Sequence, residues 1–195
     1  GKVVFALVMA KLCTALPPYT VKGLAAALAA AGSIMALVML QPDLGSTLVY
    51  AVMLAAVLIA AGTPVKVLAG MAAAGLAMLP LGWMVLKPYQ RMRLLVFIDP
   101  SIDPQGAGYN VIQSRIAVGS QGKLHFLPEP HTDFIFSVFS EEFGFAGCIV
   151  VLFLFGVLLL RVLAVSQYTK DVRAKLMCVA IAAWLWFQIF ESVAM

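Results

Sequence analysis

Charged side chains are scarce in this sequence. Asp, Glu, Lys and Arg make up 11% of the 195 residues, whereas hydrophobic residues make up 63%. No soluble domain of this size can bury so much apolar surface, so a soluble globular protein is excluded. Segments of alternating hydrophobicity, typical of a transmembrane β-barrel, are also absent, and helices must therefore satisfy the backbone in lipid. The sequence predicts an all-α, polytopic helical membrane protein.

Cysteine and histidine are equally few. Cys13, Cys148 and Cys178 lie in apolar segments without CxxC spacing, so we interpret them as small core residues and expect neither a disulfide nor a cysteine metal site. His125 and His131 have no third ligand nearby, which gives no zinc spacing. No Gly-rich phosphate loop is present. No nucleic-acid partner is expected.

Six hydrophobic segments are visible, at about 3–16, 22–40, 46–62, 65–86, 134–161 and 174–195. Four of them approach or exceed the roughly 20 residues needed to span a bilayer. The first and last look cut off, so we expect a piece of a longer protein. Pro80 predicts a kink in the fourth segment. Small residues at short intervals favour close helix packing in lipid: Ala26, Ala30, Gly70, Ala74 and Gly75.

The placement of positive charge predicts the orientation. The loop at 161–175 holds four basic residues and one acid, so we expect it in the cytoplasm. Alternation then places the QPDLG turn and a long loop, 87–133, on the outer side. We expect a single membrane domain, 1–195, with this loop inside it. Apolar residues at helical spacing over 109–118 fit a short helix on the outer membrane surface or a packed loop helix about equally.

Acidic residues concentrate in the stretch 122–143, which also holds both histidines. Asp133 stands just before an apolar helix, where it is either an N-cap or a general base at the membrane–water boundary. At about 100° per residue, Ser137, Ser140, Glu141 and Gly144 fall near the azimuth of Asp133, while Glu142 points the other way. Glu141 would lie ~12 Å deeper along a straight helix. A carboxylate there needs a cation, a proton or water, and an interhelical hydrogen bond or ion pair would supply it.

Two further polar clusters are candidates. Gln41 and Asp43 interrupt two apolar runs; Asp43 either starts the next helix or pairs with an arginine of the long loop and shapes a cavity. Five basic residues of the long loop form the second cluster: Lys87, Arg91, Arg93, Arg115 and Lys123. They are either surface charge or a binding site for a diphosphate-bearing lipid. Composition and spacing leave a transporter, an enzyme and a scaffold open.

Four stretches are more specific: QPDLGS at 41–46, YQRMR at 89–93, DPQGAGYNVIQSRIAVGS at 103–120 and FLPEPHTDFIFSVFSEEFGFAG at 126–147. Together they resemble the RodA branch of the SEDS family, which also contains FtsW. The resemblance spans nearly the whole chain, and FLPE-x-HTDFIF followed by EEFG favours RodA over FtsW. It implies a bacterial inner-membrane protein with ten membrane helices in its full form, about six of them in this chain.

The resemblance implies a peptidoglycan glycosyltransferase that polymerises lipid II on the outer face of the membrane during cell elongation. The essential acid of the family's HTDF motif falls on Asp133, the expected catalytic residue. Substrate contacts are expected from Arg91, Arg93, Gln113, Arg115, Lys123, Glu129 and His131. A structural polar network is expected from Gln41, Asp43, Ser137, Glu141 and Glu142. The implied partners are a class B penicillin-binding protein and other membrane proteins of the rod complex.

No cofactor is certain from this resemblance. A divalent cation, magnesium or manganese, would help to neutralise the departing diphosphate, with ligands unassigned. The sequence departs from the family around Lys123, where a longer Gly-rich stretch is usual, and at Glu191, where Asn is more common. The family's PLPFxSYGG-like motif lies beyond this chain. A lipid II flippase and a non-catalytic scaffold for a penicillin-binding protein are the alternative functions.

Overall fold

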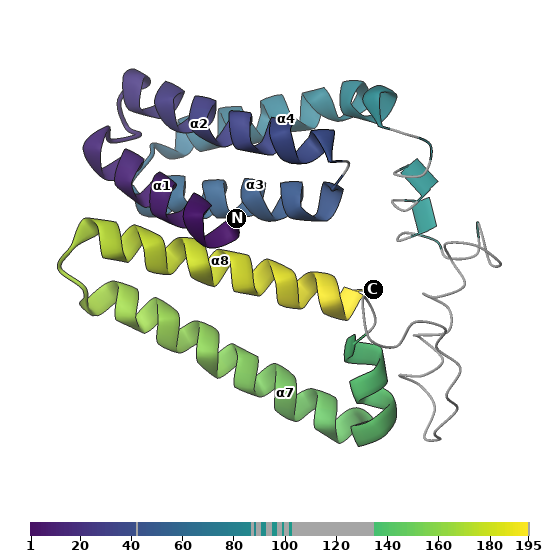
Figure 1. The fold of residues 1–195 in the computed structure, drawn as a ribbon. Helices are drawn as coiled ribbons and strands as arrows, with labels where there is room; N and C mark the ends of the chain where they lie inside the picture. The colour runs from purple at the N-terminus through teal and green to yellow at the C-terminus, as the bar shows by residue number, and fades with distance from the viewer. Residues whose placement is uncertain are drawn as a thin grey trace. The chain divides into compact units, whose positions relative to one another are not determined.

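The computed structural model describes residues 1–41, 43–86, 88, 91–92, 95–96, 99, 102 and 135–194. These residues form helices and short connections, and no strand occurs among them. The six long helices are α1 (Lys2–Ala15), α2 (Val21–Leu40), α3 (Leu44–Ala60), α4 (Val65–Val85), α7 (Ile135–Tyr168) and α8 (Val172–Ala194) (Figure 1). They correspond to the six predicted segments. The fifth segment runs further than expected, to Tyr168.

Within the described residues, four helical stretches are long and apolar enough to cross a membrane: Val21–Leu40, Val65–Met84, Phe143–Tyr168 and Val172–Ser192. Helix α3 is apolar but shorter, with 17 residues. The prediction of a polytopic helical membrane protein is therefore confirmed. Pro80 lies inside α4, as expected from the sequence. Most of the loop 87–133, with its predicted helix at 109–118, lies outside the described residues.

The chain divides into two compact units. One contains residues 1–78 and 157–188, and the other contains residues 79–156 and 189–195. In the first unit, α1, α2 and α3 pack against one another in all three pairs. The second unit contains the end of α4 and the beginning of α7.

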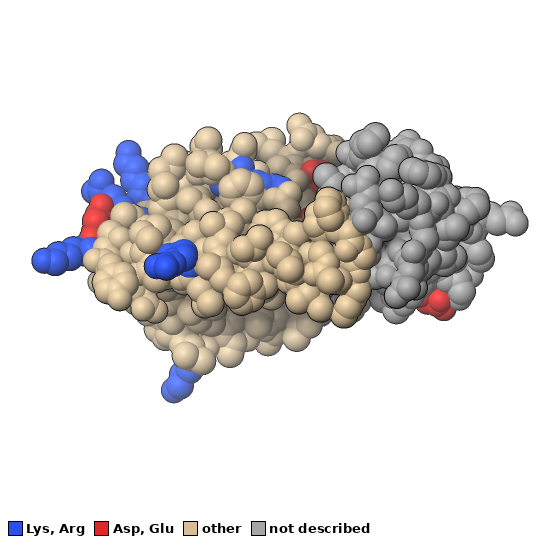
Figure 2. Space-filling model, turned by 90° about the horizontal axis from the view of Figure 1, so that it is seen from below, with Lys and Arg blue, Asp and Glu red and all other residues tan. Residues whose placement is uncertain are grey.

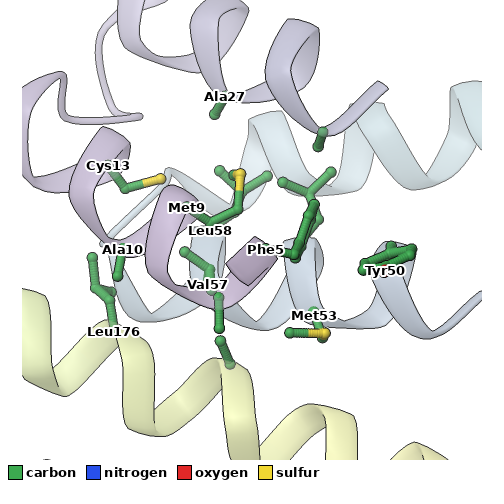
Figure 3. Packing of buried hydrophobic residues seen from close by; sticks show 14 of the residues in the cluster. Phe5, Met9, Ala10, Cys13, Ala27, Tyr50, Met53, Val57, Leu58 and Leu176 are labelled. Carbon is green, nitrogen blue, oxygen red and sulfur yellow. The ribbon is translucent and has the colours of Figure 1, made fainter. Parts of the chain in front are cut away.

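The core of the first unit is built mainly from α1 and α3. Figure 3 shows Phe5 and Met9 of α1 close to Met53 and Leu58 of α3, with Leu176 of α8 completing the cluster. All five side chains are at most 2% exposed. Because lipid tails are as apolar as these side chains, this cluster is stabilised by close packing and dispersion rather than by exclusion of water.

Small residues bring α2 onto this core. Gly23, Ala27 and Ala31 follow one another at four-residue spacing and are buried. A Cβ on Gly23 would lie 2.2 Å from the main-chain oxygen of Pro17, in the connection between α1 and α2. The close approach of α2 to this connection therefore requires glycine. The predicted pair, Ala26 and Ala30, is one position away and only half-buried. The small residues predicted to pack on α4, including Gly70 and Ala74, are exposed in the structure.

The helix connections of the first unit fall at two ends. The α1–α2, α3–α4 and α7–α8 connections lie at one end, and the α2–α3 turn lies at the other (Figure 1). Exposed basic residues stand at or beside the first three connections: Lys22, Lys66, Lys170, Arg173 and Lys175. Figure 2 shows most of the visible Lys and Arg side chains at that same end. The helix connections of the first unit are therefore divided between two ends, as the predicted orientation requires.

Candidate active site

Helix α7 contains the backbone of three predicted network residues. Ser137, Glu141 and Glu142 lie in its first segment, Ile135–Phe143, where the backbone is helical. At 100° per residue this segment places Ser137 near the azimuth of Glu141 and away from Glu142, as the sequence argument assumed. Their side chains lie outside the described part of the structure.

The helix does not continue straight beyond this segment. Gly144 has φ 67° and ψ −174°, which is not helical, and α7 kinks there (Figure 1). The predicted polar stripe included Gly144, on the assumption of regular helical geometry from Asp133 onward. The membership of Gly144 was wrong, because its backbone is not helical. Residues after Gly144 cannot extend the stripe, so its possible members end at Glu141.

Asp43 caps the N-terminus of α3. Its Oδ1 accepts a hydrogen bond from the Ser46 main-chain N–H at 3.0 Å, and its main-chain oxygen accepts one from the Thr47 hydroxyl at 2.8 Å. This satisfies a main-chain donor that a helix end leaves unpaired. Two roles were predicted for Asp43, and the structure shows the first of them, the start of the next helix. Pairing with an arginine of the long loop concerns residues mostly outside the described part.

Gln41 ends the preceding helix. It is the C-cap of α2, and its main-chain N–H donates to the Val38 oxygen at 3.0 Å. Gln41 and Asp43 therefore form one short turn between α2 and α3, at the end of the first unit opposite the basic connections (Figure 1). In this turn the described hydrogen bonds of both residues serve the helix ends.

Arg91 is bound to the end of α4. Its Nη2 donates to the main-chain oxygen of Met84 at 2.9 Å, and its guanidinium carbon lies 5.9 Å from the centre of the Trp83 ring. The Nε atom is buried without a hydrogen-bond partner among the described residues. Helix C-termini leave main-chain oxygens unpaired, and a cation there is favourable. Arg91 thus has a structural contact that the sequence did not predict, and its other N–H groups leave room for a second role.

The remaining predicted site residues are not in the described part of the chain. They are the catalytic candidate Asp133 and the substrate candidates Arg93, Gln113, Arg115, Lys123, Glu129 and His131. Their roles stay predictions. Among the described residues, no three of His, Cys, Asp and Glu come together as a metal site. Both histidines lie outside those residues, so the divalent cation also stays a prediction.

Comparison with known sequences decides the family. The family described as cell cycle proteins FtsW, RodA and SpoVE matches residues 1–195, the whole chain. The chain belongs to this family. The membership predicted from the four motifs, in the SEDS family of RodA and FtsW, is thereby confirmed.

Individual relatives carry both names. "Probable peptidoglycan glycosyltransferase FtsW" of Neisseria gonorrhoeae is 36% identical over 80% of this chain and 37% of its own length. "Peptidoglycan glycosyltransferase MrdB" of Escherichia coli is 35% identical over 82% of this chain and 46% of its own. "Peptidoglycan glycosyltransferase RodA" of Treponema pallidum is 39% identical over 59% and 29%. The chain thus spans less than half of these relatives, and their identities do not separate the RodA branch from FtsW.

Sequence reasoning missed the way in which two glycines of this SEDS chain shape α7. Gly144 interrupts the helix, and Gly147, three residues later, lies against Phe143 and Phe139. The available signal was the sequence EEFGFAG, in which two glycines follow a pair of acids at the start of a long apolar run. Glycine in a membrane helix is usually read as a packing residue, and that reading gave no reason to expect a break.

Proposed function

We propose that this protein is a peptidoglycan glycosyltransferase that polymerises lipid II on the outer face of the bacterial inner membrane. The observation that carries the proposal is the match of the whole chain to a family whose relatives bear that name, together with the HTDF motif at 131–134. Four membrane-length helices agree with a lipid-linked substrate.

Asp133 is the proposed general base. The acceptor sugar presents its 4-hydroxyl, and the Asp133 carboxylate takes that proton as the oxygen attacks the anomeric carbon of the lipid-linked donor. The bond from that carbon to the diphosphate oxygen breaks, and undecaprenyl diphosphate leaves with the electron pair. Attack from the opposite face converts an α-linked donor into a β-1,4 bond. The diphosphate ester supplies the driving force, so no nucleotide is required.

The departing diphosphate requires positive charge. We propose that Arg91, Arg93, Arg115 and Lys123 supply it, because guanidinium groups bind phosphate oxygens in forked geometry. Arg91 is the one of these with described contacts, and it uses one N–H on the oxygen of Met84. A guanidinium carries five N–H donors, so the anchored side chain still has donors for a phosphate. Anchoring by α4 would also reduce the entropy lost on binding.

Within the family we propose the RodA branch and a role in cell elongation. FLPE at 126–129, followed by HTDFIF and EEFG, supports this assignment. The proposed partners are a class B penicillin-binding protein, which crosslinks the new strands, and the membrane proteins of the rod complex. A divalent cation would add Lewis-acid stabilisation of the leaving group.

The proposed orientation places the basic connections of the first unit in the cytoplasm. Lys22, Lys66, Lys170, Arg173 and Lys175 are exposed at or beside the three connections at one end. Asp43 stands in the turn at the opposite end (Figure 1). Charge and helix alternation both support placing that turn, and the loop 87–133, on the outer side.

Purified full-length protein incubated with lipid II tests the proposal, with products separated on a gel. Glycan polymer is expected from the wild type and none from Asp133→Asn. Asn caps helices about as well as Asp, so the variant should fold. If Asp133→Asn folds and still makes polymer, Asp133 is not the base. Lipid II flipping without polymer would instead identify a transporter, and partner binding without either activity would identify a scaffold.

A further inference from the structure

Gly144 has a backbone conformation that only glycine adopts readily. Its φ of 67° and ψ of −174° fall in the region where a Cβ of an L-residue clashes with its own backbone. A Cβ placed there would meet no other group within 4 Å. The requirement for glycine therefore comes from the backbone angle alone, and not from a neighbouring side chain.

A second glycine supports the kink from the other side. A Cβ on Gly147 would lie 2.5 Å from the Cβ of Phe143 and 3.5 Å from Cε1 of Phe139. The Phe139 and Phe143 rings stack at 4.5 Å with 23° between their planes. The aromatic pair of the first segment therefore packs directly on Gly147 of the second, with no space for a larger residue.

We propose that Gly144 and Gly147 form a corner that positions the catalytic carboxylate. Asp133 precedes the Ile135–Phe143 segment by two residues in the sequence, so a change in the direction of that segment would move the point at which Asp133 is attached. This inference rests on the proposed function, since it assigns positioning residues to the Asp133 reaction. Gly144 and Gly147 act through Asp133 and do not contact the reacting atoms.

Gly156 offers a matched control in the same helix. A Cβ added to this glycine would meet no group within 4 Å, as at Gly144, but its backbone angle is not in the left-handed region. Substitution to Ala should be tolerated at Gly156, since Ala favours a helix. The pair Gly144→Ala and Gly156→Ala thus differs in backbone angle and not in side-chain space.

The first measurement is geometric. Spin labels at Ile135 and Leu152, in a cysteine-free version of the full-length protein, report the distance between the two segments. A straight helix would separate these Cα atoms by ~26 Å, at 1.5 Å per residue, and the kink makes the distance shorter. Gly144→Ala should lengthen it toward the straight value, whereas Gly156→Ala should leave it unchanged. An unchanged distance in Gly144→Ala overturns the corner.

The second measurement is kinetic, on unlabelled protein. Gly144→Ala should lower kcat for lipid II polymerisation by about 10²-fold, as expected for a displaced catalytic group, with KM unchanged. D-Ala at 144, introduced by cell-free synthesis, should restore both kcat and the short distance, because a D-residue at these angles has the mirror image of an ordinary extended conformation. A merely structural role would lower the yield of folded protein but not kcat per folded molecule.

Gly147→Ala keeps the inference testable if Gly144→Ala does not fold. It should displace Phe143, lengthen the label distance in part and lower kcat less than Gly144→Ala does. Normal kcat in both variants, with an active wild type, overturns the positioning role while leaving the proposed function intact. An inactive wild type overturns the proposed function, and this inference with it.

Discussion

Two aspartates stand close before apolar helices in the sequence, and the helices that follow them differ. Asp43 directly precedes α3 in the packed first unit, and its carboxylate accepts a hydrogen bond from the main chain of Ser46. Asp133 stands two residues before α7, ahead of a segment bent at Gly144. A helix whose side chains are locked in a core uses its acid as a cap. The bent segment of α7 is the one that we propose to position a catalytic acid.

The same substitution at both positions gives the largest expected contrast. Asp133→Asn should lower polymerisation about 10²-fold or more, because the amide cannot accept the proton. Asp43→Asn should keep activity, because Asn also caps a helix. The measurement is the rate of glycan formation per folded molecule. Equal losses in both variants would mean that the two aspartates belong to one functional site.

Labelling from outside the cell tests whether Asp43 lies on the outer face of the membrane, the face proposed for Asp133. A single cysteine at Gln41, beside Asp43, should react with an impermeant maleimide in intact cells or spheroplasts, and one at Tyr168 should not. Both positions are exposed in the structure. The background lacks Cys13, Cys148 and Cys178, and permeabilised cells provide the control for reactivity. Reaction at Tyr168 alone would reverse the proposed orientation.

A core substitution should affect stability without affecting chemistry. Met53 of α3 is fully buried in the core of the first unit, and Met53→Ala should cost roughly 2 kcal/mol. This is at the low end for such changes, because in lipid mainly the cavity and lost packing count. Met78→Ala is the control, since Met78 is 63% exposed. Thermal unfolding in detergent measures the difference, and unchanged kcat is expected in both variants. A kcat loss in Met53→Ala would couple this core to the active site.

The smallest expected effect distinguishes two uses of the Asp43 side chain, helix capping and its negative charge. Asp43→Ala removes the acceptor for the Ser46 N–H and should cost about 1 kcal/mol, whereas Asp43→Asn should be close to neutral. Unfolding in detergent compares the two variants with the wild type. An equal loss in both would show that the negative charge itself is used, as in the predicted ion pair with an arginine of the loop.

The helices were largely predictable because membrane segments can be recognised by their length and apolar composition. The ends of α2 and α4, for example, agree with the predicted ones within a residue or so. Packing faces were harder. Gly23, Ala27 and Ala31 lie one position from the predicted pair, since an Ala-rich helix offers several similar faces.

The candidate site shows a similar division. Asp133 came from a family motif, since local sequence gave capping and catalysis as open alternatives. The contact of Arg91 with Met84 could not be predicted, because it depends on where the chain turns after α4. The break at Gly144 was missed because helical periodicity assumes a constant 100° per residue. A single positive φ removes that assumption, and no periodicity argument detects it.

The composition of the first core also has a consequence for the order of assembly. Its members from α1, α2 and α3 lie within residues 5–58, and the next, Leu176, follows 118 residues after Leu58. Contacts between neighbouring helices form early and at low entropic cost, whereas α8 must wait for the whole intervening chain. During synthesis, α1, α2 and α3 should therefore associate first as a three-helix intermediate. Until Leu176 arrives, that intermediate presents Ala10 and Val57 (Figure 3) to lipid, and the late docking of α8 completes the core.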